Sequence, residues 1–111
     1  MSTSEVTVTD AARLAEEGAM LLDVREDDEW QAGHAPQAEH IPMSKLGQEL
    51  DRLDQGRRVV AICRSGARSD RAATALRQRG YDAVNVEGGM QAWAAAGLPV
   101  VTDAGGAGQV I

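Results

Sequence analysis

The chain has 111 residues, of which 11 are Lys or Arg and 17 are Asp or Glu, so its formal net charge is −6. This length fits one domain rather than two, and an acidic chain is a poor general binder of nucleic acids and membrane surfaces. No apolar run is long enough for a membrane span and no signal-peptide pattern is present, so we expect a cytoplasmic protein without nucleic-acid or membrane partners.

The first half of the chain is predicted to alternate between short strands and short helices. Residues 20–24 form a nearly continuous apolar run, which is typical of a strand covered on both faces. Acidic residues in the first turn favour a helix over residues 26–32, and Gly33 is placed to end it. The other predicted elements are a strand at residues 6–8 and a helix from Thr9 or Asp10 to residue 17.

The second half continues this alternation. Residues 58–63 are the clearest strand, and a helix is predicted from about residue 69 to residue 79. The remaining predicted elements are an extended piece at residues 41–43, a helix after Ser44 that carries Leu46, Leu50 and Leu53, a strand at residues 83–86 and a helix at residues 90–95.

This pattern predicts an α/β domain of three layers, in which helices cover both faces of a central, mostly parallel sheet. We expect the domain to span residues 5–100, after a short tail at residues 1–4. Residues 101–111 are rich in Gly and Ala, and we expect them to form a flexible C-terminal tail. Ligands of such sheets lie beyond the carboxyl ends of the strands, which directs attention to the residues that follow Ile62.

The charge is distributed unevenly around this point. Residues 57–79 hold seven arginines and one acidic residue, whereas residues 1–56 hold 4 basic and 13 acidic side chains. An anionic ligand would respond to this local positive charge more than to the net charge, because physiological salt screens charges beyond about 8 Å.

Cys63 is the only cysteine, which excludes an intramolecular disulfide, a cysteine zinc site and a two-cysteine redox cycle within the chain. It begins a segment named here the Cys63 loop, residues 63–69, which leads directly into a predicted helix. The N–H groups at the start of that helix and the cations Arg64 and Arg68 favour the thiolate over the thiol. Gly66 has no Cβ and allows a sharp turn with N–H groups aimed inward. We therefore expect a nucleophilic thiolate in an anion-binding loop.

Four segments, in order and with the expected spacing, resemble the rhodanese-like family, and in particular small single-domain thiosulfate sulfurtransferases. The resemblance covers nearly the whole predicted domain, although Gln37 stands where the family usually has Gly. The four segments are residues 21–25 (LLDVR), the stretch with Glu29-Trp30, Gly33-His34 and His40-Ile41-Pro42, the Cys63 loop, and a C-terminal signature of Gly80-Tyr81, residues 86–93 (VEGGMQAW) and residues 97–100 (GLPV).

The resemblance implies a two-step sulfur transfer in which Cys63 is the catalytic nucleophile and the carrier of a persulfide. Arg64 and Arg68 would bind a small anionic donor such as thiosulfate, and the acceptor would be cyanide or a thiol, including a thiol of a protein. No metal and no cofactor is expected. The residues expected to bind the donor and the persulfide are Arg64, Ser65, Gly66, Ala67, Arg68 and Ser69.

Other polar residues are interpreted as structural. Asp23 and Arg25, beside a buried strand end, are expected to form an ion pair that supports the Cys63 loop. His34 and His40 are expected to be hydrogen-bonded histidines rather than ligands or bases. Residues 26–29 are interpreted as a solvated acidic face, and Trp93 is expected to pack the last helix.

Two other functions stay open at this point. A phosphatase of the related dual-specificity type would hold an oxyanion in a loop with five residues between Cys and Arg, whereas four lie between Cys63 and Arg68. Ile62 also stands where many such phosphatases have His. The non-enzymatic alternative is a regulatory or interaction module, or a relay to one specific protein, although many such modules have lost the cysteine that is present here.

Overall fold

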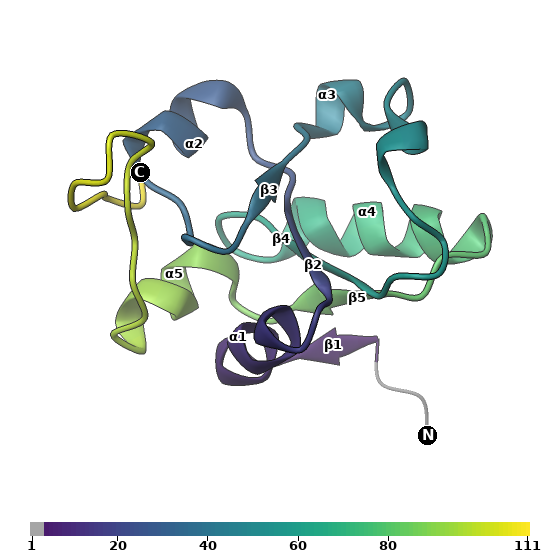
Figure 1. Ribbon diagram of the computed structural model, residues 1–111, viewed down its shortest axis with the longest axis horizontal. Coiled ribbons are helices and arrows are strands. Elements are labelled where there is room, and N and C mark those ends of the chain that lie inside the picture. Colours follow the sequence, from purple (N-terminus) through teal and green to yellow (C-terminus); the bar gives the residue numbers. More distant parts are fainter. Residues whose placement is uncertain (1–3) are drawn as a thin grey trace.

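A computed structural model describes residues 4–111, and at its centre lies a five-stranded sheet in the order β1-β5-β4-β2-β3 (Figure 1). Each of its four pairs of neighbouring strands is parallel, which confirms the predicted α/β class and parallel sheet. The strands are β1 (Glu5–Val6), β2 (Met20–Asp23), β3 (Glu39–His40), β4 (Val59–Ile62) and β5 (Ala83–Val86).

Helices cover both faces of the sheet, as the sequence predicts. Helices α1 and α5 pack on one face, and α3 and α4 pack on the other (Figure 1). Over residues 4–111, no helix is long and apolar enough to cross a membrane. The helices are α1 (Val8–Glu16), α2 (Asp27–Ala32), α3 (Met43–Leu46), the short 3₁₀ turn η1 (Leu50–Arg52), α4 (Ala67–Gln78) and α5 (Gly89–Ala95).

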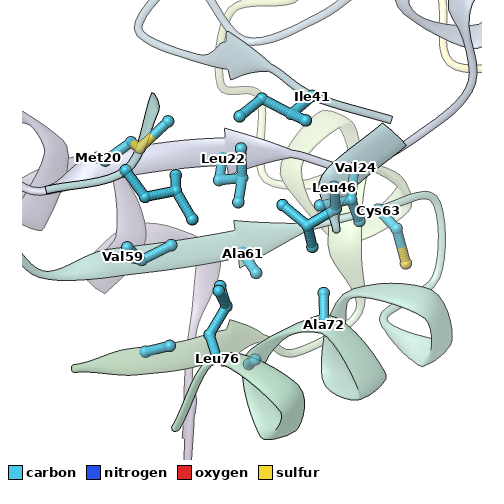
Figure 2. Close-up of a cluster of buried hydrophobic side chains, with 13 residues drawn as sticks. Met20, Leu22, Val24, Ile41, Leu46, Val59, Ala61, Cys63, Ala72 and Leu76 are labelled. Carbon is cyan, nitrogen blue, oxygen red and sulfur yellow. The ribbon is translucent and has the colours of Figure 1, made fainter. Parts of the chain in front are cut away.

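Alternate residues of the central strands form two separate cores. Every residue of β2, β4 and β5 is buried, so both faces of these strands must be apolar or hydrogen-bonded. Leu22 and Ala61 face α3 and α4, and Cys63, which follows β4, continues this core to the start of α4 (Figure 2). Leu21 and Val60 point to the opposite face, against α1 and α5. The period of two along each strand therefore places Cys63 on the α4 side of the sheet.

Several predicted elements differ from the structure. Strand β1 ends at Val6 rather than at residue 8, and β3 lies at Glu39–His40, before the extended piece predicted at residues 41–43. Helix α1 begins earlier than expected, because the side chain of Thr7 accepts a hydrogen bond from the N–H of Asp10 and caps it, and Val8 is buried inside it. The predicted helix after Ser44 is divided into α3 and η1, which start after Pro42 and Glu49. Its leucines still reach the core, since Leu46 and Leu53 are buried and Leu50 packs against the same cluster.

Residues 101–111, expected from their composition to be a flexible tail, pack against the segment between α2 and β3. The N–H of His34 donates to Val101 O at 2.9 Å, and the N–H of Val101 donates back to His34 O at 2.8 Å. A Cβ added to Gly33 would lie 2.5 Å from Gln109 N, so the missing side chain allows this close approach. Gly108 in the C-terminal segment meets the same constraint, since a Cβ added to it would lie 2.7 Å from Gly33 Cα.

Candidate active site

The Cys63 loop turns sharply at the carboxyl edge of β4 and leads into α4. Gly66 caps the helix with a left-handed φ of 108°, a conformation that other residues rarely adopt. Helix α4 starts at Ala67, two residues before the predicted start, so its first turn lies within the loop itself. The free N–H groups of that turn are thereby brought to the cysteine.

Cys63 is buried, and its sulfur lies among hydrogen-bond donors of the loop. The N–H of Gly66 is 3.1 Å from Cys63 Sγ, and Ser69 Oγ is 3.2 Å from it. Burial of the thiol raises its pKa, but hydrogen bonds from the Ser69 hydroxyl and from the N–H groups of Ser69, Gly66 and Ser65 outweigh burial, so that the pKa of Cys63 is lowered. The surroundings of the sulfur favour the thiolate, as the sequence analysis expects.

Helix α5 fixes the orientation of the loop from outside. The N–H of Met90 donates to Cys63 O at 2.7 Å, and the N–H of Gln91 donates to Arg64 O at 3.0 Å. Because the C=O and N–H of a trans peptide point in opposite directions, the N–H groups that follow these two carbonyls turn away from α5. A Cβ on Gly89, whose φ is +56°, would clash with Cys63 O and lie 2.7 Å from Arg64 O. The sequence analysis places Gly88 and Gly89 in the C-terminal signature but predicts no contact between them and the Cys63 loop.

Besides α5, the side chain of Asn85 also contacts the Cys63 loop, and the sequence analysis missed this residue. It lies on β5, is 1 % exposed, and its Nδ2 donates to Gly66 O at 3.2 Å. Its Oδ1 accepts a hydrogen bond from Ser69 Oγ at 2.6 Å. A polar residue inside an otherwise apolar, buried strand was the available signal, because a buried amide needs partners.

Arg68, expected to bind the donor, forms a two-fold ion pair with Glu29 of α2. The two contacts, Nη1 to Oε1 and Nη2 to Oε2, are 2.7 and 2.8 Å long. The expectation of a solvated acidic face at residues 26–29 is therefore wrong for Glu29, whose side chain is 16 % exposed. Arg64, by contrast, is exposed, and the part of the chain that the structure describes holds no ion pair of this residue.

The predicted ion pair of Asp23 and Arg25 is confirmed. Arg25 Nη2 is 2.7 Å from Asp23 Oδ2, and neither side chain is exposed. The same Nη2 donates to Gly33 O at 2.8 Å, and Nη1 donates to Glu29 O at 3.3 Å. Asp23 and Arg25 thus fix α2 to the end of β2, and α2 in turn supplies the partner of Arg68.

The two histidines and Trp93 have the structural roles that the sequence indicates. The ring of Trp30 stacks on both histidines, with centroids 3.6 Å from His34 and 4.7 Å from His40. His34 Nε2 lies 2.8 Å from Asp103 Oδ1 in the C-terminal segment. Trp93 is buried in the core between α5 and the sheet.

The ion pair with Arg68 makes the stability of the protein depend on Glu29 in acid. The hydrogen bond from Arg68 lowers the pKa of Glu29 from 4.5 to about 2, against the opposing effect of burial. A lowered pKa stabilises the fold above pH 4.5, and this contribution is lost as the pH falls toward 2. We expect wild type to lose about 1–3 kcal/mol more unfolding free energy than Glu29→Gln between about pH 5 and pH 2.5, measured by urea unfolding.

The exposed Asp28 on the same helix supplies the control, since Asp28→Asn should keep the wild-type pH dependence. The same loss of stability in wild type and Glu29→Gln would show that the ion pair does not hold α2 to the loop.

A matched pair of glycine substitutions tests whether α5 orients the Cys63 loop. Gly89→Ala and Gly97→Ala both place a side chain at positive φ, with a penalty of about 1–2 kcal/mol each. Nothing lies within 4 Å of a Cβ on Gly97, so only Gly89→Ala should displace the loop. We expect Gly89→Ala to raise the pKa of Cys63 by about one unit, measured from the pH dependence of its alkylation by iodoacetamide. An unchanged pKa, or an equal rise in Gly97→Ala, would contradict this role.

Comparison with known proteins agrees with this geometry. The family model described as "Rhodanese-like domain" matches residues 7–96. A sulfurtransferase of Allochromatium vinosum is 42% identical over 95 residues, which are 84% of this chain and 89% of that protein. The Bacillus subtilis protein YtwF is 47% identical over 79 residues, 71% of this chain and 77% of its own.

Solved structures show the same fold. The crystal structure of a rhodanese-related protein from Thermoplasma volcanium has a TM-score of 0.83 and 33% identity, and the match covers 89% of this chain and 98% of that one. Together with the relatives, these matches support sulfur transfer as the general class of reaction. The chain, with one cysteine in a loop at the edge of a parallel sheet, belongs to the rhodanese-like family.

Proposed function

We propose that this protein is a thiosulfate sulfurtransferase, which moves a sulfane sulfur through a persulfide on Cys63 to cyanide or a thiol. The observation that carries the proposal is the position of the cysteine. Its sulfur accepts hydrogen bonds from backbone N–H groups of a tight loop at the start of α4. Such a site stabilises an anionic sulfur and needs no metal or organic cofactor to do so.

The chemistry consists of two displacements at sulfur. In the first, the Cys63 thiolate attacks the outer sulfur of thiosulfate, the S–S bond of the donor breaks, and sulfite leaves with the bonding electron pair. The negative charge then rests on the outer sulfur of the persulfide. In the second, the acceptor attacks that outer sulfur and the Cys63 thiolate is regenerated. Both steps share one enzyme intermediate, so ping-pong kinetics are expected.

The size of the loop favours sulfur over phosphate as the group transferred. Four residues separate Cys63 from Arg68, and the Arg68 guanidinium is bonded on two nitrogens to Glu29. A phosphatase would need this arginine for the phosphate oxygens in a wider loop. A small loop that directs N–H groups at Sγ suits one sulfur atom added to the cysteine, and we therefore rank phosphatase activity below sulfur transfer.

Arg64 is the main cation that we assign to the donor, with Arg68 in a secondary role. Arg64 is exposed, whereas Arg68 is bonded to Glu29. Thiosulfate and polysulfide are both small anions that an exposed guanidinium would attract. A structural neighbour at a TM-score of 0.79 and 33% identity, from Wolinella succinogenes, is described as a polysulfide-sulfur transferase, which makes polysulfide the second donor to test.

The persulfide is tested by mass spectrometry of the intact protein. Treatment with thiosulfate should add one sulfur atom to wild type, and cyanide should remove it with formation of thiocyanate. Cys63→Ser provides the control and should show no added sulfur, because the chain has no other cysteine. A wild-type protein that shows no adduct with either thiosulfate or polysulfide would refute sulfur transfer through Cys63.

The role of Arg64 is tested by steady-state kinetics with thiosulfate and cyanide. Arg64→Gln should raise the KM for thiosulfate about tenfold, the amount expected for one lost charge-assisted hydrogen bond. Lys45→Gln, which removes an exposed cation of α3, should leave this KM unchanged. A KM that does not respond to Arg64→Gln would leave Arg68 as the donor-binding cation.

A second candidate function is delivery of sulfur to the thiol of an acidic protein. A groove of about 180 Å³ lies between α3 and α4, with Met43, Leu46 and Leu50 among its apolar residues. Arg71 and Arg79 line the same groove, and within residues 4–111 neither forms an ion pair. The groove lies beside the helix that follows the Cys63 loop. Its apolar residues and two cations would favour an acceptor with apolar and acidic side chains near its thiol.

Two synthetic peptides distinguish this acceptor from a small thiol. Each holds one Cys and two Leu, and one peptide has two Glu where the other has two Gln. The persulfide should react several-fold faster with the acidic peptide at low salt, and Arg71→Glu with Arg79→Glu should abolish that preference while cyanide is consumed at the wild-type rate. Equal rates for both peptides would remove the groove from the function.

A further inference from the structure

The amide of Asn85 can adopt only one orientation in this site. Its Nδ2 lies 3.1 Å from Glu5 Oε2 and 3.2 Å from Gly66 O. A carboxylate and a carbonyl oxygen only accept hydrogen bonds, so the NH₂ group must face them. Oδ1 therefore faces Ser69 Oγ, 2.6 Å away, and Ser69 must be the donor in that bond.

Ser69 has a single hydroxyl proton for two competing acceptors. Its Oγ lies 2.6 Å from Asn85 Oδ1 and 3.2 Å from Cys63 Sγ, and both Ser69 and Asn85 are buried from water. When the proton points to Asn85, Oγ presents a lone pair to the sulfur. A thiol suits this arrangement because its S–H can donate to that lone pair, whereas a thiolate is repelled by it.

The three chemical forms of the cysteine therefore place different demands on this proton. The thiolate gains a further donor, besides the N–H groups of the loop, only if the hydroxyl turns toward Sγ. That rotation breaks the bond to Asn85 and leaves a buried amide oxygen without its donor. In the persulfide, Sγ is bonded to a second sulfur and the negative charge lies on that outer atom. Sγ no longer needs the hydroxyl proton, and the bond between Ser69 and Asn85 can form again.

We propose that Asn85 is a positioning residue that acts through the Ser69 hydroxyl and disfavours the bare Cys63 thiolate relative to the persulfide. Asn85 touches neither the sulfur nor the donor, and its effect is transmitted by one hydroxyl rotation. A thiolate that is less well stabilised is a stronger nucleophile toward the donor sulfur. The predicted effect on the persulfide rests on the proposed function. The predicted effect on the balance between thiol and thiolate depends only on the chemistry of Cys63.

The test replaces the acceptor with an apolar side chain of similar size. In Asn85→Leu the Ser69 proton is available to the sulfur at all times, so the pKa of Cys63 should fall by about half to one unit. The pH dependence of alkylation by iodoacetamide measures this pKa. In mixtures of thiosulfate and sulfite, the ratio of persulfide to free cysteine should fall about three- to tenfold, as read by intact-protein mass spectrometry.

The sign of the shift separates this role from a merely structural one. If Asn85 only held the loop in place, its loss would move the Gly66 N–H away from Sγ and the pKa of Cys63 would rise. In a Ser69→Ala background, Asn85→Leu should no longer lower the pKa, because the proton in question is absent. A rise, no change, or the same fall with Ala at position 69 would each overturn the proposal.

Controls account for folding and for the neighbouring charges. Asn85→Val, a smaller and strand-favouring side chain without an acceptor, should give the same sign if the leucine variant does not fold. Glu5→Gln retains the contact between Asn85 Oδ1 and Ser69 and should leave the pKa of Cys63 unchanged.

If wild type forms no persulfide, the proposed function fails, while the pH dependence of alkylation still decides the role of Asn85. The charged side chains around the site, retained in all the Asn85 and Ser69 variants, are Glu5, Asp23, Arg25, Glu29, Arg64 and Arg68.

Discussion

The convergence of hydrogen-bond donors on one buried sulfur is the constraint on which the rest of this site depends. Burial alone would favour the neutral thiol, so the anionic forms of Cys63 exist only if donors are directed at them. Backbone N–H groups can do this only when the carbonyls of the same loop point outward and find partners elsewhere. The carbonyls of Cys63 and Arg64 accept hydrogen bonds from α5, and the carbonyl of Gly66 accepts from Asn85 Nδ2 and from the N–H of Asp70.

Support for the loop comes from three elements, of which β5 and α5 follow the loop in the chain and α2 lies well before it. Helix α5 holds its first residues, β5 supplies Asn85 behind it, and α2 holds Arg68 through Glu29. The last of these contacts is fixed in turn by the buried pair of Asp23 and Arg25 at the end of β2. A charge pair without solvent contact is stabilising only when both partners are retained and hydrogen-bonded, as they are here.

These contacts separate the arginines near the loop into two groups, those held by a carboxylate of the protein and those exposed to solvent. Arg68 has a structural role, because it is held by a carboxylate of the protein itself, that of Glu29. Arg64, Arg71 and Arg79, by contrast, are exposed to solvent, and they are the cations to which we assign the proposed donor and acceptor. The seven arginines in this short stretch of an acidic chain therefore do not form one uniform positive surface. The contact that sets Arg68 apart from the exposed arginines comes from Glu29, which lies 39 residues away in the chain.

Local patterns in the sequence were enough to predict the alternation of strands and helices, the parallel sheet and the ion pair of Asp23 with Arg25, which lie two residues apart. The same patterns single out Cys63 as the candidate nucleophile. Other contacts become visible only in the folded chain. These are the pairing of Glu29 with Arg68, the hydrogen bonds from Asn85 and α5 to the loop, and the packing of residues 101–111 on Gly33. Each of these contacts joins residues distant in the chain through side-chain reach or backbone approach. No local pattern encodes such distances, which depend on how parallel strands bring their ends together at one edge.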